Sequence, residues 1–151
     1  MANLDLKLIK KLRDETSASI ADCRRALDES NGNYDKALEW LKKRAAEIAA
    51  KKADRETAEG IIEAYIHQGG KVGVLVQLTC ETDFVAKTDE FKKLAKEIGM
   101  QVAAMDPKDV ETLLKQEYIR DGSTTIEGLI KNAIGKIGEN ITVKKFIRFE
   151  V

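Results

Sequence analysis

The chain of 151 residues is long enough for one domain or two small ones with a modest core. Its 26 basic and 26 acidic side chains give a formal net charge of +0, which argues against a domain that holds nucleic acid by bulk neutralisation of phosphates. No apolar run approaches the ~20 residues that span a bilayer, and the first residues show no secretion signal, so we expect a cytoplasmic protein that binds another protein.

Residues 1–50 predict three short helices that form one unit. The first is marked by apolar residues at helical spacing, Leu4, Leu8, Ile9 and Leu12, and is expected to end near Thr16. Ser17 or Ser19 is expected to cap a second helix, and Asn31-Gly32 to end it before a third helix that Asn33 caps. The unit resembles a ubiquitin-associated domain, a fold that binds other proteins without itself naming the partner.

Residues 51–59 are charged and almost free of apolar side chains. Their basic residues alternate with acidic ones, so the segment predicts a solvated linker rather than a nucleic-acid patch. We expect it to be helical at its start and mobile relative to residues 60–151.

Residues 60–151 predict an α+β core that begins with a β-hairpin. Two runs rich in β-branched residues, 61–67 and 72–78, flank a turn signal at 68–71. Neither run alternates cleanly, so we expect both faces of the sheet to be covered. A long helix over 91–105, a short polar helix over 109–116 and a loop at 121–123 follow.

The C-terminal part predicts one more helix and a last strand. Thr124 and Glu127 match a capping box ahead of an apolar stripe that runs from residue 126 to residue 137. The strand is expected to be one-sided, with Phe146 on its mostly polar face and the opposite face formed by Ile141, Val143, Ile147, Phe149 and Val151. The core is therefore predicted to be β-β-α-α-β, with helices packed on a three-stranded antiparallel sheet.

No catalytic, metal or cofactor site is convincing in this sequence. His67 is the only histidine, and Cys23 and Cys80 lack CxxC spacing, so no zinc site is expected and both thiols are predicted to be reduced. No glycine-rich phosphate-binding motif occurs, so the chain itself is not expected to bind a nucleotide. A nucleophile pair of Cys80 with His67 stays open as an alternative, because both lie on the predicted hairpin.

The most distinctive stretch is Thr79-Cys80-Glu81-Thr82-Asp83-Phe84-Val85-Ala86-Lys87, between a buried strand and a helix. Such a corner can hold side chains out toward a partner, and Thr82 or Asp83 can cap its first turn. Glu81 and Asp83 are expected to be caps or surface charge rather than metal ligands. The residues alone leave two interpretations of Phe84 open, since it either folds back into the core or is displayed.

Thr82-Asp83-Phe84-Val85-Ala86-Lys87 resembles the hallmark of the translation elongation factor Ts family of bacteria and organelles. Three further stretches are similar to the same family and in the same order: residues 16–27, residues 51–56, and Ile137-Gly138-Glu139-Asn140-Ile141 with residues 146–150. The known role of this family is guanine-nucleotide exchange on elongation factor Tu, which releases GDP so that GTP can bind. The resemblance implies the same role here, without a cofactor and without bond-making catalysis, in the bacterial cytoplasm or in an organelle.

The resemblance also implies which residues bind the partner. The three-helix unit would dock on the GTPase domain of Tu through Leu12, Arg13 and a loop that contains Thr16, Ser17, Ala18, Ser19 and Ile20. The exchange wedge would be formed by Thr82, Asp83, Phe84 and Val85, with Asp83 and Phe84 inserted near the Mg²⁺ and phosphate site. This favours a displayed Phe84.

Two features depart from the family pattern. The family has Thr-Gly-Ala-Gly in the first loop, where this chain has Thr16-Ser17-Ala18-Ser19, and serine takes a positive φ less readily than glycine. Longer members carry a duplicated core half and a helical insertion, whereas this chain has one half. A single half sheet leaves an apolar face or edge, so we predict a homodimer and a 2:2 complex with Tu. A bare adaptor, whose three-helix unit recruits another protein while the sheet only dimerises, is the alternative function.

Overall fold

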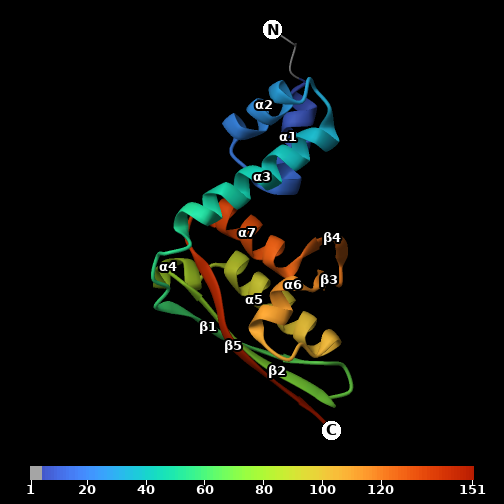
Figure 1. Ribbon diagram of the computed structural model, residues 1–151, viewed down its shortest axis with the longest axis vertical. Helices are drawn as coiled ribbons and strands as arrows, with labels where there is room; N and C mark the ends of the chain where they lie inside the picture. The colour runs from blue at the N-terminus through green and yellow to red at the C-terminus, as the bar shows by residue number, and fades with distance from the viewer. Residues whose placement is uncertain (1–4) are drawn as a thin grey trace.

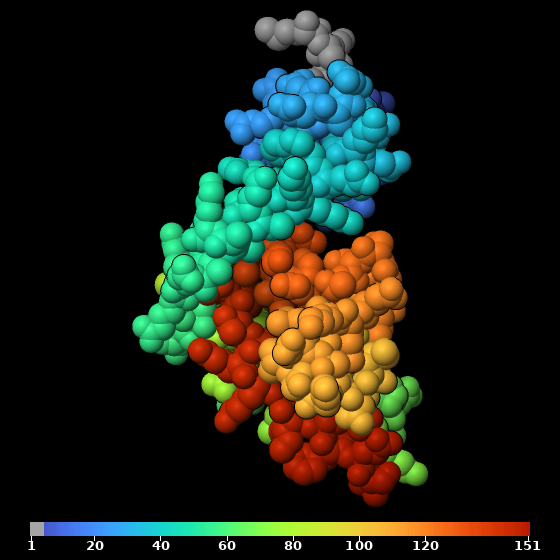
Figure 2. All heavy atoms as spheres, viewed as in Figure 1, coloured from blue at the N-terminus to red at the C-terminus, as the bar shows by residue number. Residues whose placement is uncertain are grey.

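A computed structural model describes residues 5–151. The molecule is elongated, with a three-helix unit at one end and an α+β core at the other (Figure 1, Figure 2). Leu4, predicted to begin the first apolar stripe, lies outside the described residues. Within residues 5–151, no helix has the length and apolar character needed to cross a membrane.

The three predicted N-terminal helices are confirmed as α1 (Leu6–Thr16), α2 (Ile20–Glu29) and α3 (Tyr34–Lys52). Each begins after a polar residue whose side chain accepts a hydrogen bond from an N–H of the first turn; these caps are Asp5, Ser19 and Asn33. The apolar faces of the helices meet in a small core formed by Ile9, Leu12, Cys23, Ala26, Leu27, Ala37 and Leu41. Sequence periodicity and capping therefore account for this unit.

The core contains an antiparallel sheet with the strand order β1-β2-β5, formed by β1 (Glu59–Ile66), β2 (Val72–Cys80) and β5 (Ile141–Glu150). Gly69 and Gly70, at φ of 97° and 74°, make the turn between β1 and β2. The helices α5 (Asp89–Met105), α6 (Val110–Lys115) and α7 (Ile126–Ile137) lie on one side of this sheet (Figure 1). The prediction of an α+β core with helices packed on a three-stranded antiparallel sheet is confirmed.

A bulge in β5 corrects the predicted one-sided strand. Gln77 of β2 pairs with Lys145 and Leu78 pairs with Val143, so Lys144 is an extra residue on β5. One extra residue moves all later side chains to the opposite face. Ile141 and Val143 therefore point into the core, as predicted, but Ile147 and Phe149 point outward, with exposed fractions of 48% and 67%.

No part of residues 5–151 covers the outer face of the sheet, whereas the sequence predicted that both faces are covered. Its exposed large side chains are Ile62, Ile66, Leu75, Ile147 and Phe149. In the strand register Leu75 lies opposite Ile147, and Gly73 lies opposite both Ile66 and Phe149. These residues form one continuous apolar surface, which we call the outer sheet face.

A second hairpin was not predicted. It consists of β3 (Glu117–Tyr118) and β4 (Asp121–Thr125), where the sequence indicated a loop at 121–123. The fully buried Gln101 of α5 holds it: its Nε2 donates to the Glu117 carbonyl at 3.0 Å, and its Oε1 accepts from the Ile119 N–H at 3.0 Å. Thr125 rather than Thr124 caps α7, with its hydroxyl accepting from the Gly128 N–H at 3.1 Å.

Helix α3 and the segment after it join the two units. A Cβ atom on Gly135 of α7 would lie 2.8 Å from the Cβ of Ala45, so α3 and α7 approach closely at this glycine. In the segment predicted to be a mobile linker, Thr57 is buried and its hydroxyl lies 2.8 Å from that of Thr79 in β2. This segment is thus fastened to the core.

Candidate partner-binding site

Phe84 lies on a short helix, α4 (Asp83–Ala86), that follows β2 after a two-residue loop. The Thr82 hydroxyl accepts a hydrogen bond from the Val85 N–H at 3.3 Å and so caps this turn. The Phe84 side chain is 84% exposed. The interpretation in which Phe84 folds back into the core is therefore wrong, and the displayed one is confirmed.

Val85, the other apolar residue of this turn, has a different position from the one predicted for a partner-binding residue. It is 9% exposed, and Ala86 beside it is 1% exposed, so both pack into the core of the α+β unit. Their burial anchors the inner side of the turn. We therefore correct the site: Val85 anchors the α4 turn in the core, and Phe84 is the apolar side chain of this turn that is exposed.

Asp83 lies next to Phe84 at the start of α4. Its Oδ2 is 2.7 Å from Nζ of Lys87, and both side chains are more than half exposed. The hydrogen bond that the Lys87 ammonium donates to Asp83, together with the negative charge of that carboxylate, raises the pKa of Lys87. Because the ion pair is open to solvent, the Asp83 carboxylate remains accessible from outside the protein.

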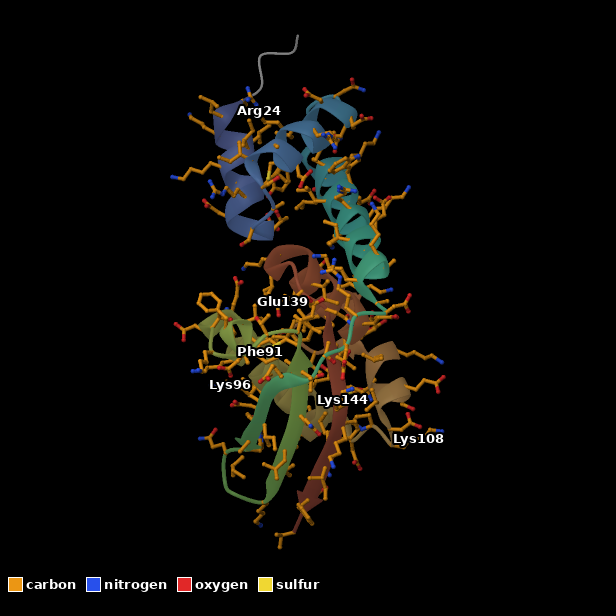
Figure 3. All side chains as sticks on the ribbon, turned by 90° about the vertical axis from the view of Figure 1, so that its left-hand side faces the viewer. Arg24, Phe91, Lys96, Lys108, Glu139 and Lys144 are labelled. Atoms are coloured by element: carbon orange, nitrogen blue, oxygen red, sulfur yellow. The ribbon has the colours of Figure 1, made fainter. Side chains whose placement is uncertain are left out.

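Glu139 contacts the loop ahead of α4, a role that we did not predict from the sequence. It lies in the turn between α7 and β5 and is seen beside α4 in Figure 3. Its carboxylate accepts hydrogen bonds from the N–H groups of Glu81 and Thr82 and from the Thr82 hydroxyl, at 3.2, 3.0 and 2.7 Å. In the sequence, the only indication that Glu139 has a role was its place in the family-like stretch Ile137-Gly138-Glu139-Asn140-Ile141. That stretch did not indicate which residues Glu139 contacts.

The predicted docking loop connects α1 to α2. Ser17 ends α1 at φ 54°, a left-handed conformation that non-glycine residues take at a cost, and Ser19 caps α2. The Thr16 hydroxyl donates to the Leu12 carbonyl at 2.7 Å and accepts from the Ala18 N–H at 3.2 Å. Arg13, Ser17, Ser19 and the half-exposed Ile20 present side chains to solvent, while Thr16 and Ala18 are partly buried.

Leu12 does not belong to this surface. It is 0% exposed and forms part of the three-helix core, so it cannot contact a partner in the folded unit. The apolar stripe of α1 turns Leu12 inward, and the prediction that it binds a partner is wrong. Leu12 instead packs in the three-helix core, at the end of α1 that leads into the loop.

The two groups of predicted residues lie in different units. In Figure 3, α1 ends toward the core, on the same side of the molecule as α4, while α3 lies on the other side. A partner would therefore meet the Thr16–Ile20 loop and the Phe84 turn from one direction. The close approach of α3 to α7 joins the two units that carry them.

The alternative of a Cys80–His67 nucleophile pair is excluded by the strand register. Cys80 lies opposite Glu59 at one end of the hairpin, whereas His67 follows Ile66 at the other end, roughly 25 Å away at ~3.3 Å per strand residue. Cys80 is fully buried. Its burial, and to a smaller extent the Glu139 carboxylate, raise the pKa of its thiol to about 11. In the part of the chain that the structure describes, no three His, Cys, Asp or Glu residues lie close enough to hold a metal ion.

Comparison with known proteins identifies the family. The sequence profile of a family described as "Elongation factor TS" matches residues 81–151. A protein of Prochlorococcus marinus (strain AS9601) named Elongation factor Ts is 42% identical to this chain, and the match covers 99% of this chain and 89% of the relative. The chain belongs to the elongation factor Ts family. The family assignment that the sequence motifs suggested is thus confirmed.

Other elongation factor Ts relatives show how the length of this chain compares with the family. The relative from Carboxydothermus hydrogenoformans is 39% identical over 96% of this chain and 88% of its own length. The relative from Nostoc sp. (strain PCC 7120) is 46% identical over 149 residues, which are 99% of this chain but 47% of the relative, so this chain spans about half its length. The Prochlorococcus match runs over 195 residues, more than the 151 of this chain, so that relative contains residues with no counterpart here.

Proposed function

We propose that this chain is a guanine-nucleotide exchange factor for elongation factor Tu, which promotes release of GDP during translation elongation without a cofactor of its own. The observation that carries the proposal is the display of Phe84, 84% exposed on a capped turn, in a chain of the elongation factor Ts family. An exposed phenylalanine on a rigid corner is a group that a partner can bury. In the proposed complex, Phe84 and Asp83 enter the nucleotide site of Tu beside its Mg²⁺ and phosphates.

The energetics require two contact surfaces. An exchange factor must bind the nucleotide-free partner more tightly than the GDP-bound partner, and GDP and the factor then weaken each other's binding by the same ratio. A thousandfold weakening corresponds to about 4 kcal/mol. Burial of one Phe side chain contributes about 1.5–3 kcal/mol. The remainder is assigned to Asp83, which disturbs the Mg²⁺ shell, and to docking of the three-helix unit through Arg13 and the Thr16–Ile20 loop.

Release of a fluorescent GDP from elongation factor Tu tests this function. The chain is expected to accelerate release, and Phe84→Ala is expected to reduce the acceleration roughly ten- to hundredfold, in line with the burial of one aromatic side chain. Met105→Ala is the matched control, because Met105 is a half-exposed apolar residue at the opposite end of α5 from the α4 turn. It should leave the rate unchanged.

Each other outcome of this measurement has a definite meaning. If the Phe84→Ala variant still accelerates GDP release, the exchange function stands, but its mechanism depends on Asp83 and the three-helix unit rather than on Phe84. Binding to Tu without acceleration would favour the adaptor. Neither binding nor acceleration by the folded wild-type chain would overturn the proposed function.

We also propose that a second copy of this chain covers the outer sheet face, giving a 2:2 complex with Tu. Five large apolar side chains are 46–69% exposed on this one surface, an arrangement that marks interaction sites in soluble proteins. The outer sheet face is complementary in shape to itself, because the strand register places the small residues Gly73 and Ala64 among the large ones. Two copies related by a two-fold axis can therefore interdigitate there.

Light scattering at micromolar concentration tests the dimer. The wild-type chain should have twice the mass of the 16.8 kDa monomer, and Phe149→Asp should shift it to the monomer mass, because a carboxylate would be buried without a partner. Lys144→Asp is the control, since Lys144 is an exposed residue at the bulge of the same strand. A clean 16.8 kDa species for the wild type would contradict the proposal.

A further inference from the structure

The loop between β2 and α4 is held by a carboxylate that comes from a distant part of the chain. Glu139 Oε1 accepts from two successive backbone N–H groups, those of Glu81 and Thr82, and Glu139 Oε2 accepts from the Thr82 hydroxyl. These three hydrogen bonds, donated by two residues, fix the position of the loop relative to the carboxylate. Hydrogen bonds to an ionised group are about twice as strong as those between neutral groups.

The contact is reciprocal. Glu81 Oε1 accepts from the Asn140 N–H at 3.0 Å, and Glu81 Oε2 lies 3.6 Å from Nη1 of Arg55. The Asn140 side chain in turn donates to the Arg55 carbonyl at 2.8 Å. Three segments that are distant in the chain, the one after α3, the loop after β2 and the turn before β5, are therefore joined at this point.

The hydroxyl of Thr82 transmits this arrangement to the turn that carries Phe84. Its only proton is donated to Glu139 Oε2, which leaves its lone pairs to accept the Val85 N–H. A helix of a single turn has too few hydrogen bonds to be stable alone. The turn from Asp83 to Ala86 therefore depends on this cap and on the burial of Val85 and Ala86.

We propose that Glu139 is a positioning residue of the exchange site: it fixes the Thr82 cap, and so holds Phe84 and Asp83 in the geometry that enters the partner. The inference rests on the proposed exchange function. A wedge that is already ordered loses less conformational entropy on binding than a loose one, so more of its burial energy remains to displace the nucleotide. Glu139 does not itself touch the nucleotide or the partner in this scheme.

Exchange kinetics at saturating concentrations of this chain provide the first test. Glu139→Ala is expected to lower the maximal rate of GDP release about tenfold, since three hydrogen bonds are lost, and Glu139→Gln less. The half-saturating concentration should change little, because the docking loop is untouched. Glu127→Ala is the matched control: Glu127 is an exposed carboxylate on α7 that pairs with Lys131 and does not reach the loop.

A double-mutant cycle with Phe84→Ala separates positioning from general damage to the fold. If Glu139 acts through Phe84 and Asp83, Glu139→Ala should have a smaller effect once Phe84 is removed, because only the positioning of Asp83 is then left to lose. An equal fold-change in both backgrounds, or a Glu139→Ala rate equal to that of wild type, would overturn the inference. Failure of the exchange function is distinguishable from this, because it would show as a wild-type chain that does not accelerate release.

Cys80 provides a readout that does not involve Tu. Its thiol is fully buried beneath the loop, with Sγ 3.1 Å from the Thr82 carbonyl, so it is alkylated only when the loop opens. Glu139→Ala should speed alkylation of Cys80 about tenfold, and leave Cys23 in the other unit unchanged, as resolved by peptide mass mapping. Unchanged alkylation of Cys80 would contradict the inference whatever the exchange assay shows.

Discussion

The two loops expected to meet the partner are built in opposite ways. The Thr16–Ile20 loop is shaped by hydrogen bonds between residues at most five positions apart, and it contains the left-handed Ser17. The loop ahead of Phe84 is shaped by bonds that span 57–59 residues, from Glu139 and Asn140. Each loop lies over a buried free cysteine, Cys23 in one unit and Cys80 in the other.

The difference shows how the proposed tasks are divided. A loop with only local bonds can adjust to a partner without disturbing the rest of the protein, which suits a docking surface. A loop tied to two other chain segments transmits force into the core, which suits a wedge that must displace a bound ligand. Predictions that test this division concern Leu12, Gly135, the two cysteines and Ser17, with the largest expected effect first.

Leu12→Ala should have the largest effect, because it removes a fully buried side chain beneath the first loop. We expect a loss of about 2–5 kcal/mol in the free energy of unfolding of the three-helix unit, measured by chemical denaturation. Leu6→Ala is the control, since Leu6 is 76% exposed on the same helix, and it should change stability by less than about 0.5 kcal/mol. Equal effects of the two variants would contradict the burial of Leu12.

Gly135→Ala should change the distance between the two loops rather than the structure of either loop. The new methyl group would lie 2.8 Å from Cβ and 3.0 Å from Cα of Ala45, so α3 must move away from α7. We expect a loss of about 1–3 kcal/mol from overpacking. Fluorescence energy transfer between labels on the two units should report a changed distance. An unchanged distance and stability would mean that this contact does not set the arrangement of the units.

Cys23 should be alkylated faster than Cys80 in the wild-type chain, by about tenfold or more. The three-helix unit has the smaller core, and small cores open more readily. Burial is the first cause that raises the pKa of each thiol, and this effect is lost when the thiol opens to water, so the two alkylation rates report how often each unit opens. Peptide mass mapping of one partly alkylated sample measures both rates together. Faster reaction of Cys80 would reverse the proposed order of loop stability.

Ser17→Gly should have the smallest effect and the opposite sign. Glycine takes φ 54° without the steric cost of a Cβ atom, and a gain of about 0.5–1 kcal/mol is expected after the greater freedom of the unfolded chain is counted. Ser17→Ala keeps the Cβ atom and should not stabilise. Thermal unfolding of the two variants measures the difference, and a gain in both would show that the strain lies elsewhere.

Much of the fold and part of the site could be predicted from the sequence. The caps Ser19 and Asn33 and the long apolar stripes are signals carried within one or two helical turns, and they placed the helices correctly. The displayed Phe84 followed from the motif around it. Leu12 shows the limit of a family resemblance, because the resemblance implied that it binds the partner while its helical spacing already placed it in the core.

Signals within a few residues determined the helices, the hairpin turn, the α+β class and the family. Only the tertiary structure decided the bulge at Lys144, the hairpin held by Gln101 and the clamp formed by Glu139. Each of these depends on a partner strand, helix or loop at least 15 residues away. A side chain's own neighbours in the sequence specify its local conformation, but which distant donor it meets depends on how the packed elements bring the two together.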